Sequence, residues 1–224
     1  MTIVEHRRHY PAPASRVITK PTKCSPVGAA NTAGPQQANA PVQPQVRPCA
    51  ALDRSLSADA AMTPEDYRSA MRQIPAAVAV VTTSSEGGRQ GLTVTAMASV
   101  SAEPPQLLIC INGGTRSAAA ISAAGFFGVN YLDSAHVELA EVFAAPTDDH
   151  QERFGRARWF DSPTGTPLLT DALIAFDCKI VSEIHSGTHI VFIGQVTGVH
   201  SHDGRPLLYE RGAFTTTAPS PVNR

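Results

Sequence analysis

The chain of 224 residues has no excess of charge of either sign. Lys and Arg together number 18, Asp and Glu together number 19, and the formal net charge is −1. A chain balanced in this way has no general electrostatic attraction to nucleic-acid phosphates or acidic lipid surfaces. We therefore expect no nucleic acid among its partners, and we expect a small molecule or another protein instead.

The sequence also lacks long hydrophobic runs. No window contains the roughly 20 consecutive apolar residues of a membrane-spanning helix, and the N-terminus lacks the apolar core of about 7–15 residues that marks a secretory signal. Several Arg and Lys residues occur early, but prolines interrupt the amphipathic helix that a transit peptide requires. We expect no membrane association and no targeting segment.

Cysteines are few and are not arranged in pairs. Cys24, Cys49, Cys110 and Cys178 form no C-x-x-C motif. Cys110 and Cys178 lie inside apolar, strand-like runs, which is typical of buried thiols in a reducing compartment. We therefore expect a cytoplasmic protein without disulfides.

Several motifs of well-known catalytic sites are missing as well. The sequence has neither a G-x-G-x-x-G element for a separate nucleotide-binding domain nor the carboxylate pairs and Ser-His-Asp order of common hydrolases. Some histidines gather near two predicted turns, without companion cysteines and without the helical H-x-x-x-H or H-E-x-x-H setting of zinc sites. We expect no metal site at these histidines, which are His185, His189, His200 and His202.

The composition changes near residue 60. Residues 1–60 are rich in Pro, Ala and Gln without periodicity, as in GPQQANAPVQPQVRP. Such a segment cannot bury enough apolar surface to offset the entropy lost on ordering, so we expect a disordered tail there. One folded domain is predicted over residues 61–218, followed by a short tail over residues 219–224.

Within the domain, strands outnumber helices. Thr63, Pro64 and the acidic residues after them predict a helix start. Short turns join several neighbouring strands, and strands joined in this way are antiparallel. The fold class predicted is mainly β, an antiparallel barrel with a few peripheral helices. The patterns predict helices at 62–74, 115–122 and 134–144, and strands at 76–83, 91–101, 106–112, 126–132, 172–184 and 188–200, with the segment LLYERGAF (207–214) closing the domain.

The predicted strand at 91–101, within GLTVTAMASVSAEPP, has unusually small side chains. Between Thr93 and Ser101 nearly every residue is small, and several carry hydroxyl groups. Such a surface suits a flat aromatic ligand lying against a sheet, with hydroxyl and backbone N–H groups at its rim. The alternative is that Ala and Thr fill a tight barrel interior.

A second candidate region follows in NGGTRSAAAI. Thr115, Arg116 and Ser117 stand at the start of a predicted helix, after a glycine turn. A helix N-terminus with hydroxyl groups and a guanidinium can bind a phosphate, although an ordinary helix cap has the same appearance. Together, the two regions suit a flat ring joined to a phosphate.

The order of these motifs resembles the flavin reductase-like domain of the FMN-binding split-barrel superfamily. The similar stretches are AVAVVTT, GLTVTAMASVSAEPP, TRSAAAI, FFGVNYL, SPTGTPLL, THIVFIGQV and GRPLLYERGAF, and they cover roughly residues 65–214. The resemblance implies an FMN-binding split barrel. Two positions depart from the family pattern: Thr188 stands where an acidic residue is often found, and Phe214 stands where tyrosine is common.

The resemblance also implies roles for individual residues. The segment containing Thr93, Val94, Thr95, Ala96, Ser99 and Ser101 is similar to the one that lines the isoalloxazine ring in relatives. The region of Asn112, Thr115, Arg116 and Ser117 is similar to the one that helps hold the ribityl phosphate. Asn130 resembles a position near the flavin, and His189 resembles a family histidine beside the nicotinamide site.

The activity implied is hydride transfer from NADH or NADPH to FMN or FAD, with release of the reduced flavin to a separate monooxygenase. Relatives are homodimers with the flavin near the subunit interface, so a homodimer is expected here. Two alternatives remain open: a non-catalytic flavin-binding module, and a flavin-dependent reductase of another acceptor such as a corrinoid. The absence of G-x-G-x-x-G favours one shared cleft for both ligands.

Overall fold

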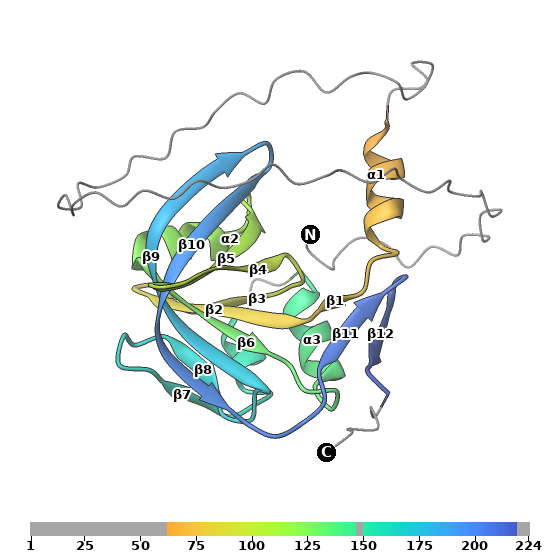
Figure 1. Ribbon diagram of the computed structural model, residues 1–224. Coiled ribbons are helices and arrows are strands. Elements are labelled where there is room, and N and C mark those ends of the chain that lie inside the picture. Colours follow the sequence, from red (N-terminus) through yellow and green to blue (C-terminus); the bar gives the residue numbers. More distant parts are fainter. Residues whose placement is uncertain (1–61, 147–149, 219–224) are drawn as a thin grey trace, which may run out of the picture. The chain divides into compact units, whose positions relative to one another are not determined.

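The computed structural model describes residues 62–146 and 150–218 (Figure 1). The tails predicted at 1–60 and 219–224 lie outside the described residues. The helices of the described part are α1 (Pro64–Met71), α2 (Arg116–Ala124), α3 (Val137–Ala144) and α4 (His150–Phe154). Its strands are β1 (Ala76–Ala77), β2 (Ala79–Ser85), β3 (Gly88–Val94), β4 (Met97–Ala102), β5 (Pro105–Asn112), β6 (Phe126–Tyr131), β7 (Trp159–Asp161), β8 (Pro167–Leu169), β9 (Ile174–Ser186), β10 (His189–Ser201), β11 (Leu207–Glu210) and β12 (Ala213–Thr216).

The strands form one large sheet and two small ones, and all strand pairs in them are antiparallel. The large sheet has the order β3-β2-β6-β9-β10-β5-β4 (Figure 1). The small sheets are β1-β11-β12 and β7-β8. This arrangement confirms the prediction of a mainly β, antiparallel fold with a few peripheral helices. No helix in the described ranges is long and apolar enough to cross a membrane.

The strand predicted at 91–101 is two strands, and this part of the prediction was wrong. β3 ends at Val94, β4 begins at Met97, and the two lie at opposite edges of the seven-stranded sheet. The backbone N–H of Cys110 on β5 already donates to the Ala96 carbonyl, at 2.9 Å. Three Cα–Cα steps reach at most about 11 Å, so the curled sheet must bring its edges together at Thr95 and Ala96. The small residues therefore mark where the barrel closes.

The apolar run of β2 does not alternate with polar residues, because both faces of this strand are buried. Ala79 and Val81 belong to the core cluster that also contains Ile109, Phe127 and Phe192. Val78 and Val80 face a second cluster, which includes residues of α3, α4 and β8. Both faces of this strand are buried, so both must be apolar.

The helix boundaries follow local rules. The Thr63 side chain and the Asp66 carboxylate bond to each other's backbone N–H groups in a capping box, which confirms the predicted helix start. α2 ends at Gly125 with a φ of 73°, a left-handed conformation that favours glycine. The β9–β10 turn lies at Gly187 and Thr188, slightly later than the turn predicted at 185–187.

Candidate active site

A large cleft lies beside the point where the barrel closes. Its volume is about 1040 Å³, and residues of α1, β3, β5, α2 and the α3–α4 segment line it. Seven of the residues singled out from the sequence are brought together here, although they come from four separate segments. They are Thr95, Ala96, Asn112, Thr115, Arg116, Ser117 and His189.

The pairing of β5 with β10 brings two of these residues together. Asn112, the last residue of β5, lies directly opposite His189, the first residue of β10. The backbone N–H of Gly113 donates to the Thr188 carbonyl at 3.0 Å, which continues the contact past the end of the strand. The β5 end and the β9–β10 turn therefore form one wall of the cleft.

Asn112 also shapes the loop that leads into α2. Its side-chain oxygen accepts the Gly114 N–H at 2.9 Å, and its carbonyl accepts the Thr115 hydroxyl at 2.9 Å. Thr115 is the N-cap of α2, and its side chain accepts the Ala118 N–H. Arg116 and Ser117 thus stand in the first turn of a nine-residue helix. Both the helix dipole and the first-turn N–H groups favour an anion at this end.

His189 is half-buried and has a hydrogen-bond partner on the preceding residue. Its Nδ1 atom lies 2.9 Å from the Thr188 hydroxyl. Burial lowers the pKa of this imidazole below its ordinary value, because desolvation disfavours the charged form. His189 therefore faces the cleft as a neutral ring near pH 7.

Five other residues predicted for the site lie outside the cleft lining. Val94 belongs to the barrel core, and the buried Thr93 hydroxyl donates to the Ala140 carbonyl at 2.7 Å. Asn130 is fully buried. Ser99 and Ser101 lie on β4, where Ser99 is exposed and the Ser101 hydroxyl accepts the Glu103 N–H at 3.1 Å.

Asn130 uses its amide to join three strands. It donates to the Val80 carbonyl at 2.9 Å and to the Thr82 hydroxyl at 3.1 Å, and it accepts the Leu169 N–H at 2.8 Å. These bonds connect β6 with β2 and β8. A buried polar residue in an apolar strand can therefore serve the fold itself.

The charge of the cleft was not evident from the sequence. Four arginines line it, and none of its described lining residues is acidic. Arg153 was missed, because nothing in ERFGRAR distinguishes it from its neighbouring arginines. Only the fold shows that its side chain reaches the cleft. The four are Arg68, Arg72, Arg116 and Arg153.

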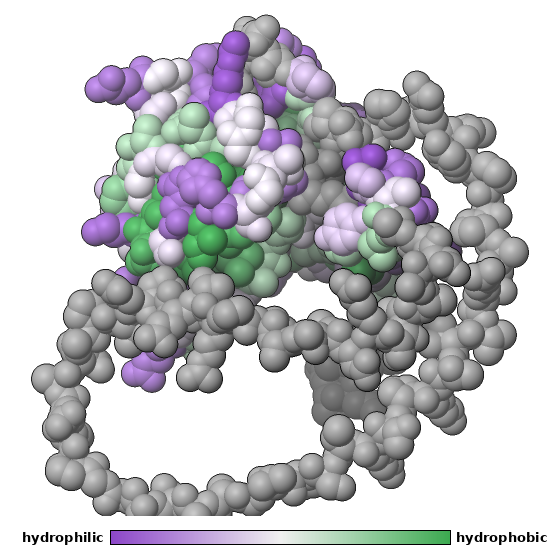
Figure 2. All heavy atoms as spheres, turned by 90° about the horizontal axis from the view of Figure 1, so that it is seen from above, coloured by the Kyte–Doolittle hydropathy of each residue, from purple (hydrophilic) through white to green (hydrophobic). Residues whose placement is uncertain are grey.

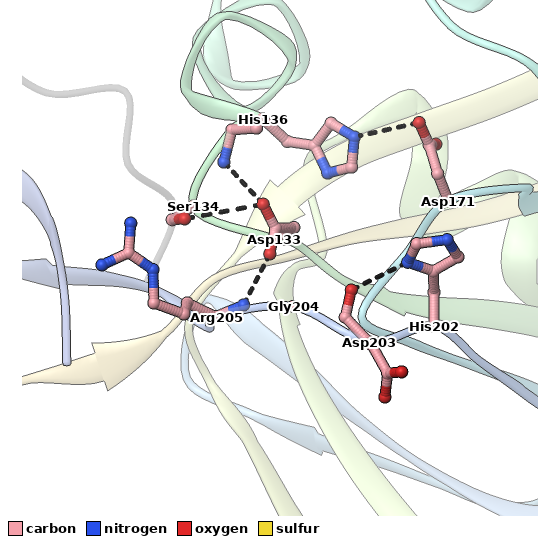
Figure 3. A pocket seen from close by; sticks show the side chains of 9 residues that line it. Asp133, Ser134, His136, Asp171, His202, Asp203, Gly204 and Arg205 are labelled. Atoms are coloured by element: carbon pink, nitrogen blue, oxygen red, sulfur yellow. Dashed lines mark hydrogen bonds and ion pairs between the residues drawn. The ribbon is translucent and has the colours of Figure 1, made fainter. Parts of the chain in front are cut away.

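A smaller hollow of about 480 Å³ lies elsewhere and contains none of the residues predicted for the site (Figure 3). Its polar groups mostly bond to one another. The Asp133 carboxylate accepts the N–H groups of Ala135 at 2.8 Å and Arg205 at 2.7 Å, and His136 lies 3.5 Å from Asp171. These contacts connect the end of β6 to the segment before β11. Among the described residues, no group of three or more His, Cys, Asp and Glu side chains is arranged to hold a metal ion.

Known proteins are similar to this chain in sequence or in fold. FMN reductase (NADH) RutF of Ancylobacter novellus is 40% identical over 162 residues, which span 72% of this chain and 89% of that protein. The structure of nitrilotriacetate monooxygenase component B from Mycobacterium thermoresistibile matches with a TM-score of 0.65 and 29% identity, over 71% of this chain and 91% of that chain.

A third match is a structure that contains NAD and FAD fragments. The NADH:FAD oxidoreductase SgcE6 of Streptomyces globisporus, in complex with NAD and FAD fragments, has a TM-score of 0.66 and 26% identity, over 70% of this chain and 94% of that chain. A family model described as the flavin reductase like domain matches residues 71–218. The chain belongs to the flavin reductase-like domain family.

Proposed function

We propose that this chain is an NAD(P)H:flavin oxidoreductase that reduces FMN with NADH and passes the reduced flavin to a partner monooxygenase. The observation that carries this proposal is the large cleft, lined by four arginines and, among its described lining residues, by no acid. Arg68 and Arg72 pair with Glu65 of α1, whereas Arg153 has no acidic partner among the described residues. FMN and NADH both carry phosphates, so a cleft lined by arginines suits both. The named activity of the Ancylobacter relative supports FMN and NADH as the preferred pair.

The cleft residues fit a flavin in both size and chemistry. A volume of about 1040 Å³ is at the upper end of small-molecule sites, which leaves space for a second ligand beside the first. Thr95 and Ala96 present small side chains where a flat ring needs room. Thr115, Arg116 and Ser117, at the start of α2, offer N–H, hydroxyl and guanidinium groups to a phosphate.

Flavin, when bound, supplies the acceptor for a hydride from the reduced nicotinamide. The protein's task is then to align donor and acceptor at about 3–3.5 Å, and no acid or base in the chain is required. His189 suits the nicotinamide side of the cleft. If the Thr188 hydroxyl donates to Nδ1, the Nε2 atom carries the proton and can donate to the nicotinamide carboxamide.

The partner oxygenase is supported by a structural relative. Nitrilotriacetate monooxygenase component B is, by its name, one component of a larger monooxygenase. We propose that reduced flavin reaches this partner by release and diffusion.

A homodimer is the second part of the proposal. α1 has no buried residue, and its Tyr67 is 54% exposed. Val181 and Ile184, near the end of the β9–β10 hairpin, are 47% and 45% exposed. Hydrophobic residues gather beside hydrophilic ones on the face seen from above (Figure 2). A second copy covering these exposed apolar side chains would remove them from water. Light scattering after size-exclusion chromatography tests this, with Val181→Asp plus Ile184→Asp expected to yield monomers.

A cytoplasmic location also remains a proposal. Cys110 and Cys178 are free thiols in the described part of the chain. Burial raises the pKa of the Cys178 thiol to about 12, so this sulfur stays protonated and inert at neutral pH. Unpaired thiols of this kind suit a reducing compartment.

One assay panel tests the proposed activity. The purified chain is mixed with NADH or NADPH, without flavin or with FMN or FAD, and loss of the reduced nicotinamide absorbance is followed. We expect oxidation only when flavin is present, with NADH and FMN the fastest pair. Flavin binding without oxidation of either donor would instead indicate a non-catalytic flavin-binding module.

A further inference from the structure

Arg153 is a buried cation at the wall of the cleft. It belongs to α4, it is only 6% exposed, and its side chain lines the cleft. Its guanidinium donates to the Ala145 carbonyl and, at 3.5 Å, to the Gly91 carbonyl. It also lies over the Phe143 ring, 5.9 Å from the ring centroid. These contacts fix the position of the group, but all of them are neutral.

The charge of Arg153 lacks an anionic partner among the described residues. The other arginines of the region show the contrast, because Arg156 pairs with Glu152 at 2.7 Å and Arg72 pairs with Glu65 at 2.8 Å. Burial lowers the pKa of the Arg153 guanidinium, because desolvation disfavours its charged form. A buried charge is costly unless it is paired, so this position favours an incoming anion.

The start of α2 lies next to this guanidinium. The Ser117 hydroxyl donates to the Gly91 carbonyl at 3.4 Å, and this is the same carbonyl that Arg153 contacts. The positive end of the helix and the buried arginine therefore meet at one backbone atom of β3. An arginine fork and helix N–H groups together are a strong combination for a phosphate.

From this arrangement we infer that Arg153 binds the phosphate of FMN, as the second arm of a site whose first arm is the start of α2. The inference rests on the proposed function, because it assumes that FMN occupies the cleft. It adds a binding residue from a part of the chain that the family motifs did not identify. It also explains why a cation is held in the interior with no carboxylate partner among residues 62–146 and 150–218.

The test compares FMN with riboflavin, which has the same ring and ribityl chain but no phosphate. Affinities are measured by fluorescence quenching for the wild type, Arg153→Gln and Arg153→Lys. Arg153→Gln should weaken FMN binding by about tenfold to a hundredfold and leave riboflavin binding within about twofold. Arg153→Lys keeps the charge and should lose less. Arg156→Gln, an exposed neighbour already paired with Glu152, is the matched control and should change neither affinity.

The outcomes separate the alternatives. An equal loss of FMN and riboflavin binding would overturn the inference, because it would show that Arg153 supports the fold through Ala145 and Gly91. Unchanged FMN affinity in Arg153→Gln would also overturn it. Dihydronicotinamide riboside is a hydride donor that carries no phosphate. If Arg153→Gln leaves FMN affinity intact and raises the KM for NADH but not for this donor, Arg153 binds a phosphate of NADH, and the inference is overturned. If Arg153→Gln does not fold, the FMN and riboflavin affinities of Arg153→Lys decide: a loss of FMN affinity alone supports the inference, and unchanged or equally reduced affinities overturn it.

Failure of the proposed function is distinguishable from these results. It would appear in the wild type, as an absence of FMN binding and of flavin-dependent NADH oxidation, before any variant is compared.

Discussion

Asn112 at the end of β5 and His189 at the start of β10 are direct cross-strand partners. The pairing places the residue that shapes the α2 entry loop next to the residue proposed for nicotinamide binding. The proposed phosphate end and the proposed hydride-transfer end of the cleft would then be built on two adjacent strands of one sheet. Geometry set by a sheet is more rigid than geometry set by loops, which suits a reaction that depends on alignment.

His189→Ala should impair the use of NADH more than the binding of flavin. A lost hydrogen bond to a neutral donor costs about 0.5–1.5 kcal/mol, so kcat/KM for NADH should fall about threefold to tenfold. Stopped-flow reduction measures the NADH step, and fluorescence quenching measures FMN affinity. His202→Ala, an exposed histidine outside the cleft, serves as the control. Wild-type NADH kinetics in His189→Ala, or equal losses for both ligands, would contradict the assignment.

Thr188→Asp should raise the pKa of His189. In the wild type the neighbouring group is a hydroxyl 2.9 Å from Nδ1, and burial keeps the pKa of the imidazole below its ordinary value. A carboxylate at that position favours the protonated ring, so protonation would begin at a higher pH. Titration of the His189 ring signals by NMR gives the pKa, with Thr188→Asn as the uncharged control. A pKa that is the same in both variants would show that this position does not control the ring.

The sequence alone was sufficient to predict the antiparallel class and most elements. Local patterns predicted β2, β5, β9 and β10 well, because their apolar runs and turn residues are short-range signals. The sequence did not indicate that the strand is interrupted at Thr95 and Ala96, because the residues on both sides continue the same small, hydroxyl-rich alternation. The break exists only because two distant edges of the sheet meet there. Closure of a sheet is a tertiary event that a local pattern does not encode.

The site was predictable only in part, for the same reason. Thr115 and Ser117 could be found, because a helix start has a local signature. Arg153 could not, because its burial depends on the packing of α4 against β3 and α3. Asn130 was assigned to the flavin site by family resemblance alone, and this assignment stays a prediction. The structure adds that its amide has three partners inside the protein.

Thr95→Trp should block flavin binding without unfolding the protein. Thr95 lies at the closure of the barrel and lines the cleft, so an indole would occupy space proposed for the ring. We expect FMN affinity to fall by at least about tenfold, which is about 1.4 kcal/mol. Ser99→Trp, on the exposed part of β4, is the control for adding an indole nearby. If Thr95→Trp retains FMN affinity, measured by fluorescence quenching, the isoalloxazine ring does not bind at this position.

Deletion of residues 1–60 should leave activity and thermal stability nearly unchanged. The family match begins at residue 71, and the Ancylobacter relative is matched over 89% of its own length by 162 residues of this chain. We therefore propose that residues 61–218 carry the activity. Flavin-dependent NADH oxidation and the melting temperature of the truncated chain provide the measurement. A loss of several degrees, or of activity, would assign a role to the N-terminal segment.

Asn130→Ala should destabilise the fold while leaving flavin affinity of the folded protein intact. The substitution removes the side-chain acceptor of the Leu169 N–H and one donor to the Val80 carbonyl, next to a fully buried side chain. An unsatisfied buried polar group costs about 1–3 kcal/mol, which corresponds to about 2–12 °C in melting temperature for a domain of this size. Calorimetry measures the first effect, and FMN titration well below the melting temperature measures the second. The family resemblance instead suggests a position near the flavin, and on that basis affinity would fall while stability changed little. The two measurements therefore decide whether Asn130 belongs to the binding site or to the framework that supports it.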